Sequence, residues 1–198
     1  QGLQFHTSDW PDDLDLSGKR VAVVGTGATA VQLVPELADV AAELVVFQRS
    51  PVWVGPKKDP EYTDAEREKF RTDPAALKEI RDQLYNLWEG TSVELHRAGT
   101  QVNTTAEARA RHEIEQAVTD PDLAKALTPD FNFACKRPTL SSRYYQTFER
   151  AHVRLVPGSV DSLTASAVVS GGLHHDVDVV IFATDDGEVL AVDRNADA

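Results

Sequence analysis

Hydrophobic residues in the first quarter of the chain form short runs separated by an amphipathic segment. Residues 19–25 are a β-branched run typical of a buried strand, and residues 43–47 are a second such run. The segment between them repeats apolar residues at helical spacing, at Val31, Val34, Ala38 and Ala41. A strand, a helix and a strand in this order predict two parallel strands joined by a right-handed crossover.

Residues 63–118 have the pattern of a helical insertion. Thr63 and Glu66 have the spacing of a capping box, in which each side chain caps the backbone of the other at the start of a helix. An apolar stripe follows at Leu77, Ile80, Leu84, Leu87 and Trp88. We expect the aromatic side chains of this region, Tyr85 and Trp88, to lie in the core or to cover the sheet.

The last third of the chain returns to strand patterns after a predicted loop at 131–138. Residues 152–156 alternate as a strand does, and two further runs flank a turn at 171–172, which predicts a small antiparallel region. The run that ends at Thr184 is almost continuously apolar, as in the central strand of a parallel sheet. The predicted fold class is α/β, with a parallel central sheet, a helical insertion and a small antiparallel strand region.

The turn after the first strand has a composition suited to a nucleotide pyrophosphate. Gly25, Gly27 and Ala30 occupy the G-x-G-x-x-A spacing between a predicted strand and a predicted helix. Gly25 permits the tight turn, Gly27 lets the backbone approach a pyrophosphate, and Ala30 lets the helix pack close to the strand. The amides at the helix start then face the anion. This pattern predicts a Rossmann-like dinucleotide-binding domain.

The residues after the second strand discriminate between the two nicotinamide cofactors. Domains that bind NAD usually carry an acidic residue there, which holds the ribose hydroxyls. This chain has Gln48, Arg49 and Ser50 instead. Because a guanidinium matches a 2′-phosphate, we predict NADPH as the cofactor. The alternative is an ordinary solvated role for Arg49 at the surface.

Composition and charge exclude other classes of partner. The 198 residues are 41% apolar, enough for one sizeable core, and no run approaches the roughly 20 apolar residues that cross a bilayer. The net charge of −12 opposes nucleic acid or an anionic membrane as a partner. A local pocket for a small dianion is still allowed, with Arg49, Lys136 and Arg137 as its cations. We expect a cytoplasmic protein.

Metal and nucleophile chemistry are not indicated. The six histidines lack the spacing of zinc ligands, so we expect no metal site. Cys135, the single cysteine, has no adjacent base and is expected to be a free structural thiol. The chain starts at Gln1 and contains no methionine, so we expect a piece of a longer polypeptide or a processed product.

The composition also predicts where the chain divides. Residues 1–18 are polar and rich in Asp, and we expect them to be an interdomain linker that ends at the first strand. Residues 19–184 are the predicted NADPH-binding domain, with its helical insertion at 63–118. The polar residues 185–198 are expected to form a loosely held tail.

Several motifs together resemble the Baeyer–Villiger monooxygenases, a family of flavoenzymes. The opening GLQFHTSDWP is similar to the family fingerprint F-x-G-x-x-x-H-x-x-x-W-P without its first Phe, and it matches at Gly2, His6, Trp10 and Pro11. The segments GTGATAVQ, FQRSP, and KRP followed by YYQTFERAHVRLV resemble the NADPH domain of the family in the same order. The resemblance covers residues 1–184.

The resemblance implies an enzyme that uses NADPH, FAD and dioxygen to insert an oxygen atom beside the carbonyl of a small-molecule ketone, giving an ester or lactone. It implies contacts with the pyrophosphate and the nicotinamide side of NADPH at Gly25, Thr26, Gly27, Thr29, Ala30 and Gln32. It implies contacts with the 2′-phosphate at Arg49, Ser50 and Lys136. Arg137 would be the catalytic arginine, which stabilises negative charge beside the flavin. His6 and Trp10 would couple cofactor position to domain movement.

The sequence differs from the family pattern at two places. The glycine motif with which the family binds FAD is missing, so we expect FAD to be bound by a part absent from this chain, and the chain alone to be inactive. Where the family has A-T-G-F after its final strand, this chain has Ala183, Thr184, Asp185 and Asp186, without the glycine. The alternatives are a domain of an N-hydroxylating or sulfur-oxidising flavin monooxygenase, and a non-catalytic nucleotide-binding module.

Overall fold

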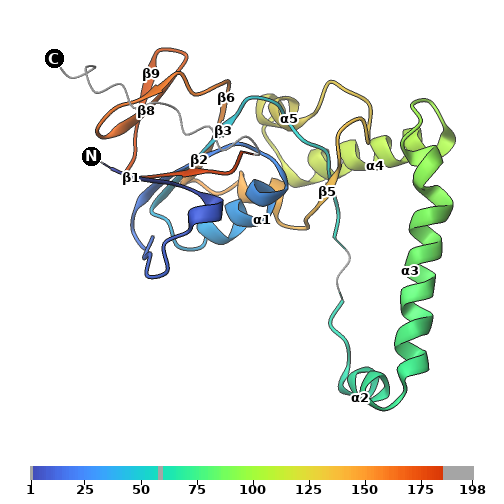
Figure 1. The fold of residues 1–198 in the computed structure, drawn as a ribbon. Coiled ribbons are helices and arrows are strands. Elements are labelled where there is room, and N and C mark those ends of the chain that lie inside the picture. Colours follow the sequence, from blue (N-terminus) through green and yellow to red (C-terminus); the bar gives the residue numbers. More distant parts are fainter. Residues whose placement is uncertain (1, 58–59, 185–198) are drawn as a thin grey trace.

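A five-stranded parallel sheet forms the centre of the computed structural model, which describes residues 2–57 and 60–184 (Figure 1). Its strands, in the order β1-β10-β2-β3-β6, are Leu3–His6, Val179–Phe182, Arg20–Val24, Glu43–Gln48 and Val153–Pro157. All four neighbouring pairs are parallel, so the carboxyl ends of the strands meet at one edge. This confirms the predicted α/β class, and it is at this edge that open α/β sheets bind ligands.

Alternate residues of the central strands face two separate cores. Val21 and Val23 of β2 pack on the side that carries helices α1 (Ala28–Leu37) and α6 (Tyr144–Thr147), whereas Ala22 packs on the other side. That other side is covered by a small antiparallel sheet. Its strands are β7 (Ser162–Leu163), β8 (Ala167–Ser170) and β9 (Leu173–Asp176). The predicted antiparallel region is therefore confirmed.

Residues 1–18 are more ordered than the predicted interdomain linker. Leu3–His6 forms strand β1 at the edge of the sheet, in parallel register with β10, and a 3-10 turn, η1 (Thr7–Asp9), follows it. The expectation that the first strand begins at residue 19 is therefore wrong. One buried side chain, Phe5, and backbone pairing with the apolar β10 are sufficient for an edge strand within a polar segment. The linker role of residues 1–18 stays a prediction.

Residues 63–118 are helical, as predicted. The insertion consists of α2 (Asp64–Thr72), α3 (Pro74–Leu95) and α4 (Gln101–Ala117). The capping box at the start of α2 is complete, because Thr63 Oγ1 accepts a hydrogen bond from the Glu66 amide (3.3 Å) and the Glu66 carboxylate accepts one from the Thr63 amide (2.8 Å).

Helix α3 does not cover the sheet. It projects away from the sheet together with α2 (Figure 1), and the side chains of Tyr85 and Trp88 are 63% and 54% exposed. The expectation that these aromatics lie in the core or over the sheet is therefore wrong. Helical spacing identifies an apolar stripe, but it does not identify what the stripe packs against.

Helix α4 returns the chain to the body of the molecule. Its residues Ala110 and Ile114 are buried in the main core. The buried side chain of Asn103 donates hydrogen bonds to the carbonyl oxygens of Leu95 (2.8 Å) and Phe133 (2.7 Å). These hydrogen bonds connect the insertion to the predicted loop at 131–138, which contains the adjacent cations Lys136 and Arg137.

Two short elements in this region were not predicted. Helix α5 (Pro121–Leu127) begins at an Asp120 cap, whose carboxylate accepts from the Asp122 amide (2.9 Å). Strands β4 (Val54–Gly55) and β5 (Thr139–Leu140) form a two-stranded parallel sheet. In the sequence, β4 follows β3 after five residues, and α5 precedes the loop at 131–138.

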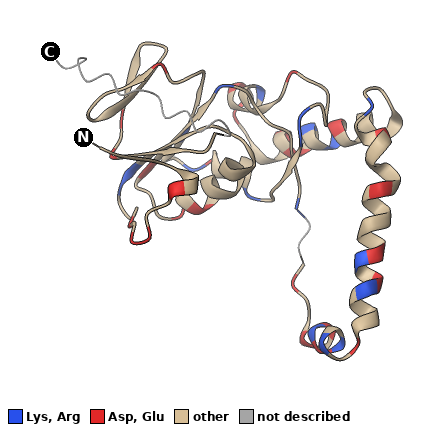
Figure 2. Cartoon of the chain, viewed as in Figure 1, with Lys and Arg blue, Asp and Glu red and all other residues tan. Residues whose placement is uncertain are grey.

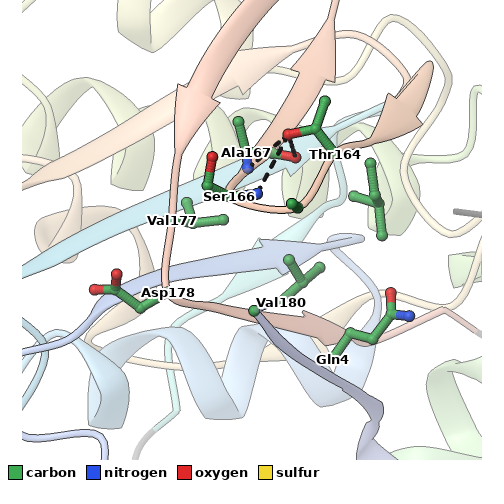
Figure 3. A pocket seen from close by; sticks show the side chains of 10 residues that line it. Gln4, Thr164, Ser166, Ala167, Val177, Asp178 and Val180 are labelled. Carbon is green, nitrogen blue, oxygen red and sulfur yellow. Dashed lines mark hydrogen bonds between the residues drawn. The ribbon is translucent and has the colours of Figure 1, made fainter. Parts of the chain in front are cut away.

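The amino edge of the main sheet carries an ion pair and a small cavity. Arg20 donates from its amide (2.9 Å) and its guanidinium (2.8 Å) to the Asp178 carboxylate. Beside this pair a cavity of about 20 Å³ lies between Gln4, Asp178 and the turn at 164–167 (Figure 3). Room for about one water molecule excludes a nucleotide there.

Within the described ranges, no helix has both the length and the apolar character needed to span a bilayer. The tail predicted at 185–198, with Asp185 and Asp186, lies outside the described residues.

Candidate functional site

The turn between β2 and α1 has the geometry that its glycines predict. Gly25 has φ +109°, and a Cβ added there would lie 2.7 Å from the Ala183 carbonyl oxygen at the end of β10. Any larger residue would displace that backbone. Gly27 is the N-cap of α1 and no side chain caps this helix, so no side-chain oxygen competes for its first amides. The turn therefore fits a pyrophosphate.

The other residues predicted on this turn occupy three different environments. Thr26 is buried, and its Oγ1 donates to the Ser50 carbonyl oxygen (2.8 Å), which ties the glycine turn to the loop after β3. Ala30 is fully buried, as close packing of helix and strand requires. Thr29 and Gln32 are exposed on α1, where Gln32 Nε2 donates to a carbonyl oxygen of its own helix (3.2 Å).

A cavity of about 300 Å³ opens at the carboxyl end of β3. Its lining includes Arg49, Ser50, Lys125, Asp130, Phe131 and Lys136. The structure thus brings Lys136 together with the adjacent residues Arg49 and Ser50, which are distant from it in sequence. The resemblance implies that all three contact the 2′-phosphate. The bond from Thr26 to Ser50 places this cavity next to the glycine turn.

The lining of this cavity is cationic although the chain is acidic, and both signs of charge occur on helices α2, α3, α4 and α5 (Figure 2). The lining contains three cations, Arg49, Lys125 and Lys136, and one carboxylate, Asp130, so its formal charge is +2. Within residues 2–57 and 60–184, none of the three cations has a carboxylate oxygen within 4.0 Å. Lys136 Nζ instead lies 4.7 Å from the ring centroid of Phe131. A bound anion would supply the missing counter-charge.

Buried aromatic residues hold the loops that form the cavity. The Tyr145 hydroxyl accepts from the Val54 amide (3.1 Å) and donates to the Val52 carbonyl oxygen (3.3 Å). Burial raises the pKa of Tyr145 to about 12, so the hydroxyl keeps its proton at neutral pH. Trp53 Nε1 donates to the Phe131 carbonyl oxygen (2.9 Å). The loop after Ser50 and the loop that carries Lys136 are therefore joined.

Arg137 is not brought into this cavity. It is exposed, and its side chain makes no hydrogen bond or ion pair within the described part of the chain. Cys135, two residues earlier in the chain, is an exposed free cysteine. Among the described residues, no group of three His, Cys, Asp or Glu side chains is placed to hold a metal ion. The catalytic role of Arg137 stays a prediction.

His6 anchors the end of β1 to the same edge of the sheet. Its Nδ1 accepts from the Ser8 amide (3.2 Å), so its Nε2 carries the proton and donates to the Thr184 carbonyl oxygen (2.8 Å). The Thr184 hydroxyl is buried and has no hydrogen-bond partner among the described residues, and its methyl group lies 3.3 Å from the Cβ position of Gly25. An unpartnered hydroxyl beside the glycine turn also fits a polar ligand there.

The other fingerprint residues lie before and after the edge strand β1. A Cβ on Gly2 would lie 3.1 Å from the Asp178 carbonyl oxygen, which explains a small residue at that position. The Trp10 ring packs edge-on against Phe5, with 5.1 Å between the ring centroids. Pro11 follows it and is half-buried. These contacts fix the segment against the sheet.

Sequence reasoning missed Lys125 as a lining residue. It lies in helix α5, which was not predicted because its apolar pattern is too short to be periodic. The Asp120 and Pro121 pair was the available signal, since Asp is favoured as an N-cap and Pro in the first turn of a helix.

The chain is similar to flavoprotein monooxygenases in sequence and in fold. A Baeyer–Villiger monooxygenase of Pseudomonas aeruginosa is 38% identical over 185 residues, which are 93% of this chain and 35% of that protein. Oxidized steroid monooxygenase bound to NADP matches with a TM-score of 0.78 and 30% identity, over 93% of this chain and 42% of that one. OTEMO in complex with FAD and NADP matches with a TM-score of 0.76 and 29% identity, over 92% and 42%. No protein-family model matches the sequence.

The chain matches only a portion of each of these proteins. The chain spans about one third of the Pseudomonas protein and less than half of each solved chain. The resemblance read from its motifs is confirmed along nearly its whole length. The chain is thus homologous to one portion of the Baeyer–Villiger-type flavin monooxygenases.

Proposed function

We propose that this chain is the NADPH-binding portion of a flavin-dependent Baeyer–Villiger monooxygenase that converts a ketone to an ester or lactone. The observation that carries the proposal is the cationic cavity at the end of β3, joined to the glycine turn through Thr26 and Ser50. A phosphate dianion fits a lining of charge +2 better than the ribose hydroxyls of NADH do. The NADP bound in the similar steroid monooxygenase supports this choice.

Each part of the site has a distinct task in this proposal. The amides at Gly27 and at the start of α1 bind the pyrophosphate, with Thr26, Thr29 and Gln32 beside it. Arg49, Ser50 and Lys136 bind the 2′-phosphate. When bound, NADPH supplies the hydride that reduces the flavin. FAD would be held by the part of the longer relatives that this chain does not span, where Arg137 would stabilise negative charge beside it. The chain alone would then bind NADPH without turnover.

Titration of the purified chain with NADPH and NADH tests the cofactor assignment. We expect tighter binding of NADPH, and a loss of most of that preference in Arg49→Ala, because the guanidinium pairs only with the 2′-phosphate. Arg81→Ala, on the projecting helix α3, is the matched control and should leave both affinities unchanged. Equal affinity for the two cofactors, or an unchanged preference in Arg49→Ala, would refute the assignment.

The competing functions differ in what the longer protein does. A domain of an N-hydroxylating or sulfur-oxidising monooxygenase would bind NADPH in the same way, but the HTSDWP segment favours the Baeyer–Villiger type. A non-catalytic nucleotide-binding module would bind the nucleotide at the same glycine turn without passing a hydride to a flavin. A full-length protein that carries this segment and consumes NADPH in proportion to lactone formed would exclude the module.

A further inference from the structure

A side-chain hydrogen bond joins the two walls of the cationic cavity. Gln48, the last residue of β3, is 3% exposed, and its Nε2 donates to the Ala126 carbonyl oxygen of α5 (2.7 Å). Gln48 is the chain neighbour of Arg49, and Ala126 is the chain neighbour of Lys125. One bond therefore sets the spacing between the elements that carry two of the cations.

Three arginines near the sheet are ion-paired, unlike the three cations that line this cavity. Arg20 is paired with Asp178 (2.8 Å), Arg143 with Asp39 (2.6 Å), and Arg150 also with Asp39 (2.7 Å). Within residues 2–57 and 60–184, Arg49, Lys125 and Lys136 have no such carboxylate partner. Three that line one cavity without such a partner repel each other, and an anion placed between them relieves that repulsion.

We propose that Lys125 is a specificity-determining residue, a third cation for the 2′-phosphate of NADPH, and that Gln48 positions it. This inference rests on the proposed function. Because Lys125 lines the cavity from α5 and Arg49 lines it from the end of β3, the phosphate would be bound by cations of two separate elements. An ammonium group serves here as a point charge, and the guanidinium supplies the directed hydrogen bonds.

Fragment ligands separate the phosphate contact from the rest of the cofactor. The chain is titrated calorimetrically with NADPH, NADH, 2′,5′-ADP and 5′-AMP, and the titrations are repeated with Lys125→Gln. We expect the variant to bind NADPH and 2′,5′-ADP about fivefold more weakly, equivalent to about 1 kcal/mol, and to bind NADH and 5′-AMP as the wild type does. Added salt should narrow the difference. Lys69→Gln on α2 removes the same charge far from the cavity and should change nothing.

The outcomes distinguish this inference from the proposed function. If the wild type prefers NADPH and Arg49→Ala loses that preference while Lys125→Gln keeps it, the role of Lys125 is refuted and the proposed function stands. An equal loss for all four ligands in Lys125→Gln also refutes a role in specificity. If the wild type does not discriminate 2′,5′-ADP from 5′-AMP, the proposed function itself fails.

A double-mutant cycle tests the positioning role of Gln48. Gln48→Met removes the amide donor while keeping a similar volume, and it should weaken 2′,5′-ADP binding in the wild type but much less in the Lys125→Gln background. A merely structural role would give the same loss in both backgrounds. Thermal unfolding of each variant shows that the comparison is made between folded proteins.

Discussion

Gly25 and Lys125 show what single residues do and do not disclose in the sequence. The role of Gly25 could be predicted from the glycine spacing alone. The structure gives the reason, since only glycine tolerates φ +109° with a backbone oxygen 2.7 Å from its Cβ position. Lys125 has no such signature, since its role depends on a short helix and on the bond from Gln48 to Ala126. Residues that are needed for backbone geometry are predictable from sequence, whereas residues placed by tertiary contacts are not.

The two kinds of glycine in this chain should respond oppositely to alanine. Gly25→Ala is expected to reduce the free energy of unfolding by about 2 kcal/mol or more, through the left-handed φ and the contact with Ala183. Gly90→Ala, in helix α3 with open space at its Cβ position, should raise it by about 0.5–1 kcal/mol. Urea unfolding measures both. A neutral Gly25→Ala would contradict the close approach of the turn to β10.

At the scale of elements, helices α3 and α4 show that a helical apolar pattern does not determine whether the apolar side chains are buried. Both follow the helical pattern of 63–118, yet α4 buries Ala110 and Ile114 while α3 exposes Leu84 and Trp88. The type of element was predictable because caps and spacing are local. The packing partner was not, because it depends on how the connections between helices fold back. For the same reason the edge strand β1 was missed within a polar segment.

Substitutions on the two helices should therefore differ in cost. Ile114→Ala is expected to lower the free energy of unfolding by about 2–5 kcal/mol, since the side chain is 1% exposed and leaves a cavity. Trp88→Ser should change it by no more than about 0.5 kcal/mol, because the side chain is 54% exposed and the two residues have similar helix propensities. Chemical denaturation of the chain checks both. A large loss in Trp88→Ser would mean that α3 packs on the body of the protein.

For the whole molecule, the parallel sheet separates the proposed nucleotide site at its carboxyl edge from an ion pair at its amino edge. The carboxyl edge carries the glycine turn, the cationic cavity and the end of the His6 strand. The amino edge carries the pair of Arg20 and Asp178 and a cavity too small for a nucleotide. The order of elements in the sequence predicts this division, because all strands of a parallel sheet point the same way. The residues that line the site lie mostly in loops. Only Arg49 could be predicted from the order of strands, because it directly follows the second predicted strand.

The ion pair of Arg20 and Asp178 at the amino edge makes the free energy of unfolding depend on pH in the acid range. Hydrogen bonds from Arg20 lower the pKa of Asp178 to about 2, below its usual 3.8. Because the folded state binds this proton less readily than the unfolded chain, the carboxylate stabilises the fold above about pH 4, and that contribution is lost as the pH falls toward 2. Asp178→Asn should be less stable than the wild type at neutral pH, and the difference should shrink across this acid range. Asp12→Asn, exposed after η1, is the control and should parallel the wild type. Unfolding curves from pH 7 to about pH 2 measure the effect, and a difference that stays constant with pH would show that Arg20 does not select the charged form of Asp178.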